Sequence, residues 1–161
     1  MLILNCGGTF NKVYNPINGS LDVAYDNLAI ETILESMNVG VNLAGVLYKD
    51  SLEMDSNDRK VIANIIMESK DDIFVIVHGT DTMHETAEFL AEIFQDRKIV
   101  LTGAMKPFEI ENVEASLNLG LSIGYINGIN ESGIYICMSG IFSKWDEIVK
   151  NRKIGKFEIV G

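Results

Sequence analysis

The sequence predicts a doubly wound α/β fold, Rossmann- or flavodoxin-like, with a mostly parallel sheet and helices on both of its faces. Short apolar runs alternate with longer amphipathic stretches along the whole chain, which is typical of strand–helix repeats that build a parallel sheet. Ile73–Val77 is a continuous β-branched and aromatic run, the pattern of a strand buried on both faces. Because no linker, repeat or charge block divides the 161 residues, we expect one domain over residues 1–161.

The first half of the chain supplies two expected strands and two expected helices. Residues 2–5 are predicted to form the first strand, which a polar, glycine-containing loop follows. A helix is predicted over residues 26–37, because its apolar residues recur at the spacing of one helix face: Leu28, Ile30, Ile33, Leu34 and Met37. Residues 41–48 are predicted to form the second strand. Asp55 can cap the next helix, residues 58–69, whose apolar face consists of Val61, Ile62, Ile65 and Ile66.

The second half repeats this pattern after the buried strand. A helix is predicted over residues 82–94, with an inward face formed by Ala87, Leu90, Ala91 and Phe94. A strand at residues 98–101, a helix at residues 113–125 and a strand at residues 134–138 follow. We expect a last strand at residues 156–160. The order of these elements is that of a parallel sheet with helical crossovers.

Composition and charge exclude several classes of partner. The formal net charge of −10 argues against nucleic acid, because binding to a phosphate backbone requires clustered lysine and arginine. No apolar run is long enough to span a bilayer, so we expect no membrane partner. Residues 1–8 lack a basic leader and an apolar stretch of signal-peptide length, which favours a cytoplasmic location.

The cysteines and histidines give no sign of a metal site. Cys6 and Cys137 each lie in or beside an apolar run, and we expect both to be reduced thiols in the core. No pair or cluster of cysteine and histidine has metal-ligand spacing. We therefore expect neither a metal ion nor another cofactor.

The loops after the predicted strands are the place to look for a site, because ligands bind beyond the carboxyl ends of strands in open α/β sheets. Small or hydroxyl-bearing residues occur in all five of these loops, at residues 6–10, 49–54, 78–82, 102–107 and 139–140. Phosphate binding is the minority reading. Gly7-Gly8-Thr9 does not lead directly into a helix, no P-loop or dinucleotide pattern is present, and Asp81 occupies the position of a phosphate.

Four of these loops carry a specific resemblance to a known family. Their motifs are Gly7-Gly8-Thr9, Asp50-Ser51 with Met54, His78-Gly79-Thr80-Asp81-Thr82-Met83 with Glu85-Thr86-Ala87, and Gly103-Ala104-Met105-Lys106-Pro107. In this order they resemble the successive signatures of bacterial-type L-asparaginases and glutaminases, in the amino-terminal, active-site domain. The match runs across nearly all of the chain, and its third motif is long and highly specific.

The resemblance implies catalysis by threonine. In the family a threonine attacks the side-chain amide, ammonia leaves, and water releases the acid from an acyl-enzyme. Thr9 matches this nucleophile and Thr80 the second catalytic threonine. Asp81 matches the neighbouring carboxylate, which also holds the substrate's ammonium group, and Lys150 falls on the catalytic lysine. Tyr14 matches the mobile-loop tyrosine that orients the nucleophile, with an ordinary loop tyrosine as the alternative.

The substrate contacts also follow from the resemblance. Ser51 matches the serine that binds the substrate's α-carboxylate. The full set of implied substrate-binding positions is Gly8, Ser51, Gly79, Thr80, Asp81 and Ala104. This chemistry suits the side chains, because a threonine hydroxyl needs a base, and a lysine can serve once desolvation lowers its pKa. Backbone N–H groups of a glycine-rich turn, as at Gly79-Thr80, can stabilise the developing oxyanion.

Four polar residues near the motifs have structural readings. His78 is expected to be packed at a strand end, and His84 to be solvated in the first turn of a helix. Asn112 and Asn118 flank a helix and are interpreted as capping or surface residues, with a site role for Asn112 as the alternative.

Three functional hypotheses remain after these comparisons. Members of the family have a second, carboxy-terminal domain, and because the sequence stops at Gly161, where the linker would begin, we expect that domain to be absent. The first hypothesis is an asparaginase-like amidohydrolase of L-asparagine or a related small amide, with its site completed in a homo-oligomer, a dimer or larger. The alternative is a non-catalytic or weakly catalytic relative that binds aspartate or an amide. A structural or interaction protein is the third.

Overall fold

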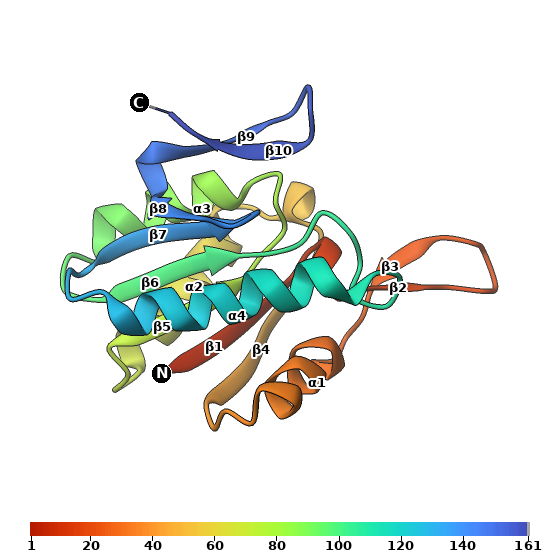
Figure 1. Cartoon of the computed structure of the whole chain (residues 1–161), viewed down its shortest axis with the longest axis horizontal. Helices are drawn as coiled ribbons and strands as arrows, with labels where there is room; N and C mark the ends of the chain where they lie inside the picture. Colours follow the sequence, from red (N-terminus) through yellow and green to blue (C-terminus); the bar gives the residue numbers. More distant parts are fainter. Residues whose placement is uncertain (161) are drawn as a thin grey trace.

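A six-stranded sheet forms the centre of the computed structural model, which describes residues 1–160 (Figure 1). The strands lie in the order β4 (Asn42–Lys49), β1 (Leu2–Gly7), β5 (Ile73–Val77), β6 (Lys98–Thr102), β7 (Gly133–Met138) and β8 (Ile141–Lys144). The first five are parallel, and β8 runs antiparallel to β7. The predicted mostly parallel sheet is confirmed, and its parallel strands have the flavodoxin-like order 2-1-3-4-5.

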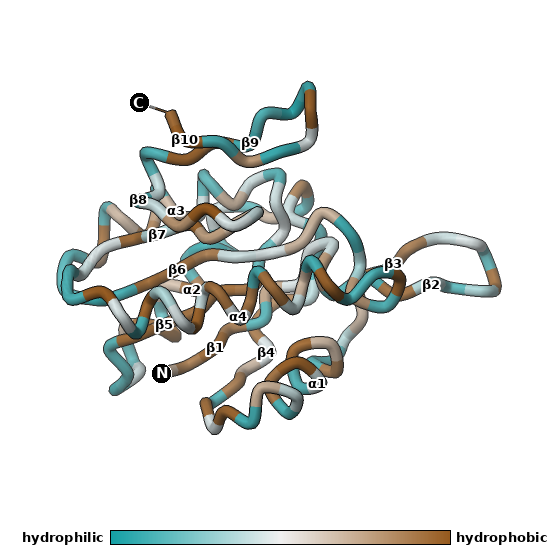
Figure 2. The backbone as a smooth tube through the Cα atoms, viewed as in Figure 1, coloured by the Kyte–Doolittle hydropathy of each residue, from teal (hydrophilic) through white to brown (hydrophobic). Residues whose placement is uncertain are grey.

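Two helices cover each face of the sheet. α2 (Ser56–Glu68) and α3 (Met83–Ile93) pack on one face, and α1 (Leu28–Met37) and α4 (Asn112–Gly128) on the other. Along β5, Phe74 and Ile76 enter the first core while Val75 and Val77 enter the second, so this strand is buried on both faces as predicted. In Figure 2 the apolar segments follow these central strands.

The helices begin and end close to the predicted residues. Asp55 caps α2 as expected, and it forms a capping box with Asp58. α1 begins at Leu28, two residues after the predicted start, because Asn27 is its N-cap. It ends at Asn38, whose φ of 52° is the left-handed conformation that terminates helices.

One crossover has the uncommon hand. The connections β4–α2–β5 and β5–α3–β6 step in one direction across the sheet and share one face, whereas β1–α1–β4 steps the opposite way on the opposite face. These three connections therefore have the same hand. The β6–α4–β7 connection steps with α2 and α3 but lies on the α1 face, so it is left-handed, against the strong general preference. The loop before α4 thus crosses the carboxyl edge of the sheet, where Phe108 N–H donates to the Phe10 carbonyl at 3.2 Å.

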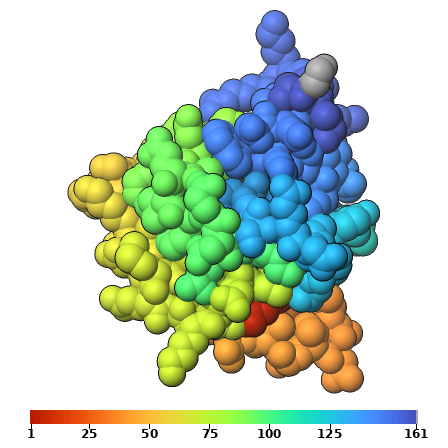
Figure 3. Space-filling view, turned by 90° about the vertical axis from the view of Figure 1, so that its left-hand side faces the viewer, coloured from red at the N-terminus to blue at the C-terminus, as the bar shows by residue number. Residues whose placement is uncertain are grey.

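Two small hairpins, absent from the sequence prediction, flank the sheet. β2 (Lys12–Tyr14) pairs with β3 (Leu21–Val23), and this hairpin projects from the body of the molecule (Figure 1). β9 (Ile148–Asn151) pairs with β10 (Lys156–Ile159), so the last predicted strand exists but lies outside the main sheet. Figure 3 shows this C-terminal segment, in blue, packed against the green segment that contains α3.

Three short 3-10 helices complete the described elements: η1 (Thr9–Asn11), η2 (Ser51–Glu53) and η3 (Trp145–Glu147). Cys6 and Cys137 are free and buried, as predicted, and burial raises the pKa of both thiols. Within residues 1–160, no helix has the length and apolar character needed to cross a bilayer.

Candidate active site

Two glycines bring the first, second and third loops together at the carboxyl edge of the sheet. Gly7 and Gly8 have φ values of 88° and 76°, which favour glycine. A Cβ on Gly8 would lie 2.4 Å from the Gly79 Cα, and a Cβ on Gly7 would lie 2.7 Å from the Lys49 backbone. Gly8 N–H also donates to the Lys49 carbonyl at 2.9 Å. Side chains at these two positions would separate the loops, so the glycines are required for the convergence.

Ser51 lies beneath the third loop. The Asp50 carboxylate accepts from Leu52 N–H and starts η2, which places Ser51 against Gly79. The Thr82 hydroxyl donates to the Ser51 carbonyl at 2.8 Å and ties the second loop to the third. The Ser51 hydroxyl itself is buried and has no hydrogen-bond partner among residues 1–160. A buried, unpaired hydroxyl is costly, so a polar ligand group beside it would satisfy it.

The centre of the candidate site is formed by Thr80, Asp81 and Lys150. The Lys150 ammonium Nζ lies 2.8 Å from Thr80 Oγ1 and 2.8 Å from Asp81 Oδ1. Thr80 and Asp81 are adjacent after β5, and Lys150 approaches from β9, nearly seventy residues later. Ile148 and Phe157 anchor the β9–β10 hairpin in the core beside α3, which fixes the lysine's approach. The structure thus brings together the three residues that the sequence placed in one site.

A small cavity of about 200 Å³ opens beside these residues. Its lining residues are Thr80, Asp81, His84, Ile136, Ile148, Val149, Lys150, Arg152 and Phe157. Arg152, which the sequence analysis missed, donates to the Asp81 carbonyl at 2.9 Å. His84 is exposed, as predicted, and its ring meets Trp145 edge-on at 5.0 Å. The cavity therefore combines a hydroxyl, a carboxylate and two cations at the end of a central strand.

The fourth loop closes against the third. The Thr80 hydroxyl lies 3.5 Å from the Met105 sulfur, and a Cβ on Gly103 would lie 2.4 Å from the His78 carbonyl. The Ala104 side chain is buried in the core beneath α4, so any ligand contact at this position has to come from its backbone.

The surface prediction for Asn118 is wrong. Asn118 is buried in α4, where its amide donates to the Gly103 carbonyl at 2.9 Å and accepts from Ser139 N–H at 3.1 Å. It therefore joins the loops after β6 and β7, because the left-handed crossover carries α4 beneath both of them. Asn112, by contrast, is an exposed residue at the start of the helix.

The remaining two predicted residues lie in the less enclosed part of the site. Thr9 is half-buried in η1, next to Gly8, and no hydrogen bond to its side chain is found within residues 1–160. Tyr14 lies in β2 and is 55% exposed. Its backbone N–H donates to the Glu109 carboxylate at 2.5 Å. The structure records no contact between the Tyr14 ring and Thr9, so the tyrosine remains outside the assembled cluster.

His78 is packed at the end of β5, as predicted. Its Nδ1 lies 2.8 Å from the Gly79 carbonyl and its Nε2 lies 3.0 Å from Thr86 Oγ1. Complete burial, together with the nearby Arg59 guanidinium, lowers the pKa of His78 to about 4, although the Gly79 contact opposes the shift. The imidazole is therefore neutral near pH 7.

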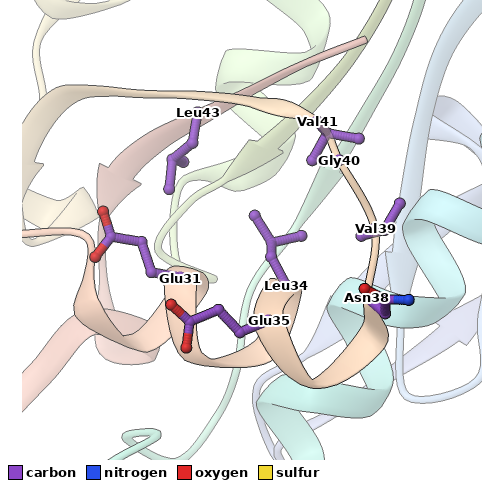
Figure 4. Close-up of a pocket in the computed structure, with 8 residues that line it drawn as sticks. All are labelled: Glu31, Leu34, Glu35, Asn38, Val39, Gly40, Val41 and Leu43. Atoms are coloured by element: carbon purple, nitrogen blue, oxygen red, sulfur yellow. The ribbon is translucent and has the colours of Figure 1, made fainter.

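A larger hollow elsewhere lacks the chemistry of a catalytic site. It measures about 520 Å³ and lies between α1 and the start of β4 (Figure 4). Glu31 and Glu35 project from the helix and Leu43 from the strand. Because it adjoins the amino end of β4 and contains neither a hydroxyl nor a cation, it is a poorer candidate than the smaller cavity. Within residues 1–160, no cluster of three metal-binding side chains is found.

Comparison with known proteins agrees with the geometry of the site. Residues 1–157 match the family model described as "Asparaginase, N-terminal". The chain is 34% identical over 127 residues to "Probable L-asparaginase periplasmic" of Haemophilus influenzae, covering 73% of this chain and 36% of that protein.

Two solved structures have the same fold. The thermostable L-asparaginase from Thermococcus kodakarensis matches with a TM-score of 0.83 and 23% identity, over 99% of this chain and 50% of that one. "Probable Cytoplasmic L-asparaginase" from Campylobacter jejuni matches with a TM-score of 0.80 and 25% identity, over 98% and 52%. This chain thus spans about half the length of these structures, and about a third of the Haemophilus protein. It belongs to the asparaginase family, whose N-terminal domain it matches, and the predicted resemblance is confirmed.

Proposed function

We propose that this domain carries the principal active-site residues of a threonine amidohydrolase, which releases ammonia from L-asparagine or a related small amide. The observation that supports this proposal best is the placement of Lys150 Nζ at 2.8 Å from both the Thr80 hydroxyl and the Asp81 carboxylate. A binding site for an amino acid has no evident need for a lysine on a threonine hydroxyl. Proton transfer during covalent catalysis does need such a contact.

The proposed reaction has two steps. Thr9 Oγ1 attacks the side-chain amide carbon, its proton is taken up by the site, and the C–N bond breaks as ammonia leaves with a proton. Water then attacks the resulting ester, which releases the acid and returns the proton to Thr9. In this scheme Lys150 and Thr80 move the proton, and Asp81 holds the lysine in place. The reaction consumes only water and needs no metal or redox cofactor.

The proposed substrate contacts use both side chains and backbone. Asp81 would hold the substrate's ammonium group, and the unpaired Ser51 hydroxyl would bind the α-carboxylate. Backbone groups of Gly8, Gly79 and Ala104 would line the remainder, because their compact geometry lets a ligand approach the chain closely. A zwitterionic α-amino acid with an amide side chain fits this donor and acceptor set.

A second copy of the chain is proposed to complete the site. The first loop is the open part, since Thr9 has no hydrogen-bond partner within residues 1–160 and Tyr14 is 55% exposed. A homodimer or larger assembly could cover this side and bring a further polar group to the nucleophile. Whether residues 1–161 act as a single domain is part of the same proposal.

The test is ammonia release from L-asparagine and L-glutamine by the purified protein. Two variants, Thr9→Ala and Thr80→Val, are assayed beside the parent after circular dichroism and thermal unfolding have shown that they fold. We expect release by the parent and its loss in both variants.

No release by the parent over a wide substrate range would overturn the hydrolase proposal for these amides. The alternative, a non-catalytic amino-acid-binding relative, would then be tested by calorimetric titration with L-aspartate. It predicts binding that Ser51→Ala weakens and Thr9→Ala leaves unchanged.

A further inference from the structure

The third motif contains two residues, Glu85 and Thr86, for which the proposed chemistry has no use. In the structure they belong to a hydrogen-bonded chain beneath the candidate site. Arg59 Nε on α2 donates to Thr86 Oγ1 at 3.2 Å, and the Thr86 oxygen lies 3.0 Å from His78 Nε2. The Arg59 guanidinium also pairs with Glu85 at 2.8 Å. Thr86 and His78 have no exposed surface, so water does not compete for these bonds.

The direction of each bond in this chain is determined by its partners. The Gly79 carbonyl can only accept, so His78 Nδ1, 2.8 Å away, carries the proton. His78 Nε2 is then the acceptor of the neutral ring and takes the Thr86 hydroxyl proton. Thr86 Oγ1 in turn accepts from Arg59 Nε, which can only donate. The sequence Arg59 to Thr86 to His78 to the Gly79 carbonyl is therefore a single, fully satisfied relay.

The last bond of the relay acts on the peptide that joins Gly79 and Thr80. This peptide is trans and planar, so its carbonyl and its N–H point in opposite directions. A hydrogen bond that holds the Gly79 carbonyl therefore also sets the direction of the Thr80 N–H. Among residues 1–160 no acceptor is found for this N–H. A free donor next to the proposed proton-transfer residues is suited to stabilising an oxyanion.

We propose that Arg59, Thr86 and His78 are positioning residues, which hold the Gly79–Thr80 peptide so that the Thr80 N–H faces the reacting carbonyl oxygen. This proposal rests on the proposed function, and it explains the spacing between His78 and Thr86 within the motif. The relay contacts neither substrate nor nucleophile. It acts through the orientation of one peptide group.

The test compares Thr86→Val with Thr86→Ser. Valine has nearly the shape of threonine but removes both the donor to His78 and the acceptor of Arg59, whereas serine keeps the hydroxyl. The control is Thr32→Val on α1, where the lost hydroxyl is exposed and bonds only to the Leu28 carbonyl. Thermal unfolding identifies any variant that fails to fold. For each variant kcat and KM are measured separately with L-asparagine.

We expect Thr86→Val to lower kcat by about tenfold to a hundredfold with KM nearly unchanged, because an oxyanion donor acts mainly in the transition state. Thr86→Ser should restore most of kcat, and Thr32→Val should match the parent. A folded Thr86→Val variant that keeps the parent's kcat would overturn the proposal while the proposed function stands. So would an equal loss in Thr86→Ser.

A parent without activity would overturn the proposed function, and nuclear magnetic resonance then decides the relay separately. The ¹⁵N shifts of His78 should show the proton on Nδ1 in the parent. The Thr80 amide resonance should move or broaden in Thr86→Val and return in Thr86→Ser. A proton on Nε2, or a Thr80 amide that Thr86→Val leaves unchanged, would contradict the relay.

Discussion

The third loop and the first loop lie side by side in the candidate site, but they are held in very different ways. His78 is completely buried, and Thr80 and Thr82 are 7% and 9% exposed. Lys150, Arg152, Thr86 and Ser51 all bond to groups of this loop or of its two ends. In the first loop, Thr9 has no partner within residues 1–160 and Tyr14 is 55% exposed. One half of the site is preorganised, and the other half is open.

The position of each loop in the fold explains this difference. The third loop follows β5, which has neighbours on both sides in the sheet and is buried on both faces. The first loop continues into the projecting β2–β3 hairpin, whose base is fixed mainly by Asn11. The Asn11 amide donates to the Ala24 and Asp26 carbonyls at 2.9 and 3.0 Å. Beyond this base, the Lys12–Asp50 pair at 2.6 Å is the main link to the second loop.

The largest effect is expected from Lys150→Met, which removes the cation from the preorganised half. Ammonia release should fall by about a hundredfold to ten-thousandfold, the usual contribution of a positioned acid or base. Lys153→Met, in the exposed turn of the same hairpin, is the matched control and should keep the parent's rate. A Lys150→Met variant within about threefold of the parent would show that the lysine only stabilises the loop.

The second prediction concerns the pH dependence of stability, which His78 should dominate in its range. Its pKa is about 4 in the folded protein and 6.5 ordinarily, so between these values the unfolded chain binds more protons. The stabilisation is present above pH 6.5 and is lost as the pH falls towards about 4, by about 3 kcal/mol. Urea unfolding at a series of pH values measures the slope. His78→Asn should flatten it, and an unchanged slope would assign it to other groups.

A smaller loss is expected when the brace between the fourth and fifth loops is removed. Asn118→Leu leaves the Gly103 carbonyl and the Ser139 N–H without their partner and should cost about 1–3 kcal/mol of unfolding free energy. Asn127→Leu, an exposed position on the same helix, should change it by less than about 0.5 kcal/mol. Equal effects of both substitutions would mean that Asn118 acts through helix propensity alone.

The smallest effect on stability is expected in the open half. Lys12→Met breaks the partly exposed pair with Asp50 and should change the unfolding free energy by less than about 1 kcal/mol. Amide hydrogen exchange should nevertheless become faster in residues 12–23, since the hairpin loses its link to the second loop. Lys144→Met, which breaks an exposed pair with Glu131, is the control. Unchanged exchange in residues 12–23 would show that the hairpin is held by its base alone.

The sequence was sufficient where residues repeat with the period of a helix or a strand. The parallel strands and all four helices were predicted for this reason, as was the buried character of β5. The β2–β3 and β9–β10 hairpins were missed because their strands have only three or four residues with few buried side chains. The left-handed crossover follows no local pattern and runs against the general preference.

The site shows the same division. The motifs identified the loops that meet, and the resemblance assigned Lys150, which no spacing rule connects to Thr80. Arg152 lies in a charged turn, and nothing in the sequence distinguishes it from a solvated residue. Asn118 was misread because α4 is apolar over most of its surface, so that a lone asparagine there resembles a surface residue. Its role depends on two loops that only the folded chain brings to the helix.

The central claim, that the open and preorganised halves act in one reaction, is tested most directly by a double-mutant cycle on Thr9 and Thr80. Ammonia release from L-asparagine is measured for the parent, Thr9→Ala, Thr80→Val and the double variant. Residues that serve a single covalent mechanism are strongly non-additive. We predict a large loss in each single variant and no further loss in the double variant. Losses that multiply, or a single variant that keeps the parent's rate, would contradict a shared site.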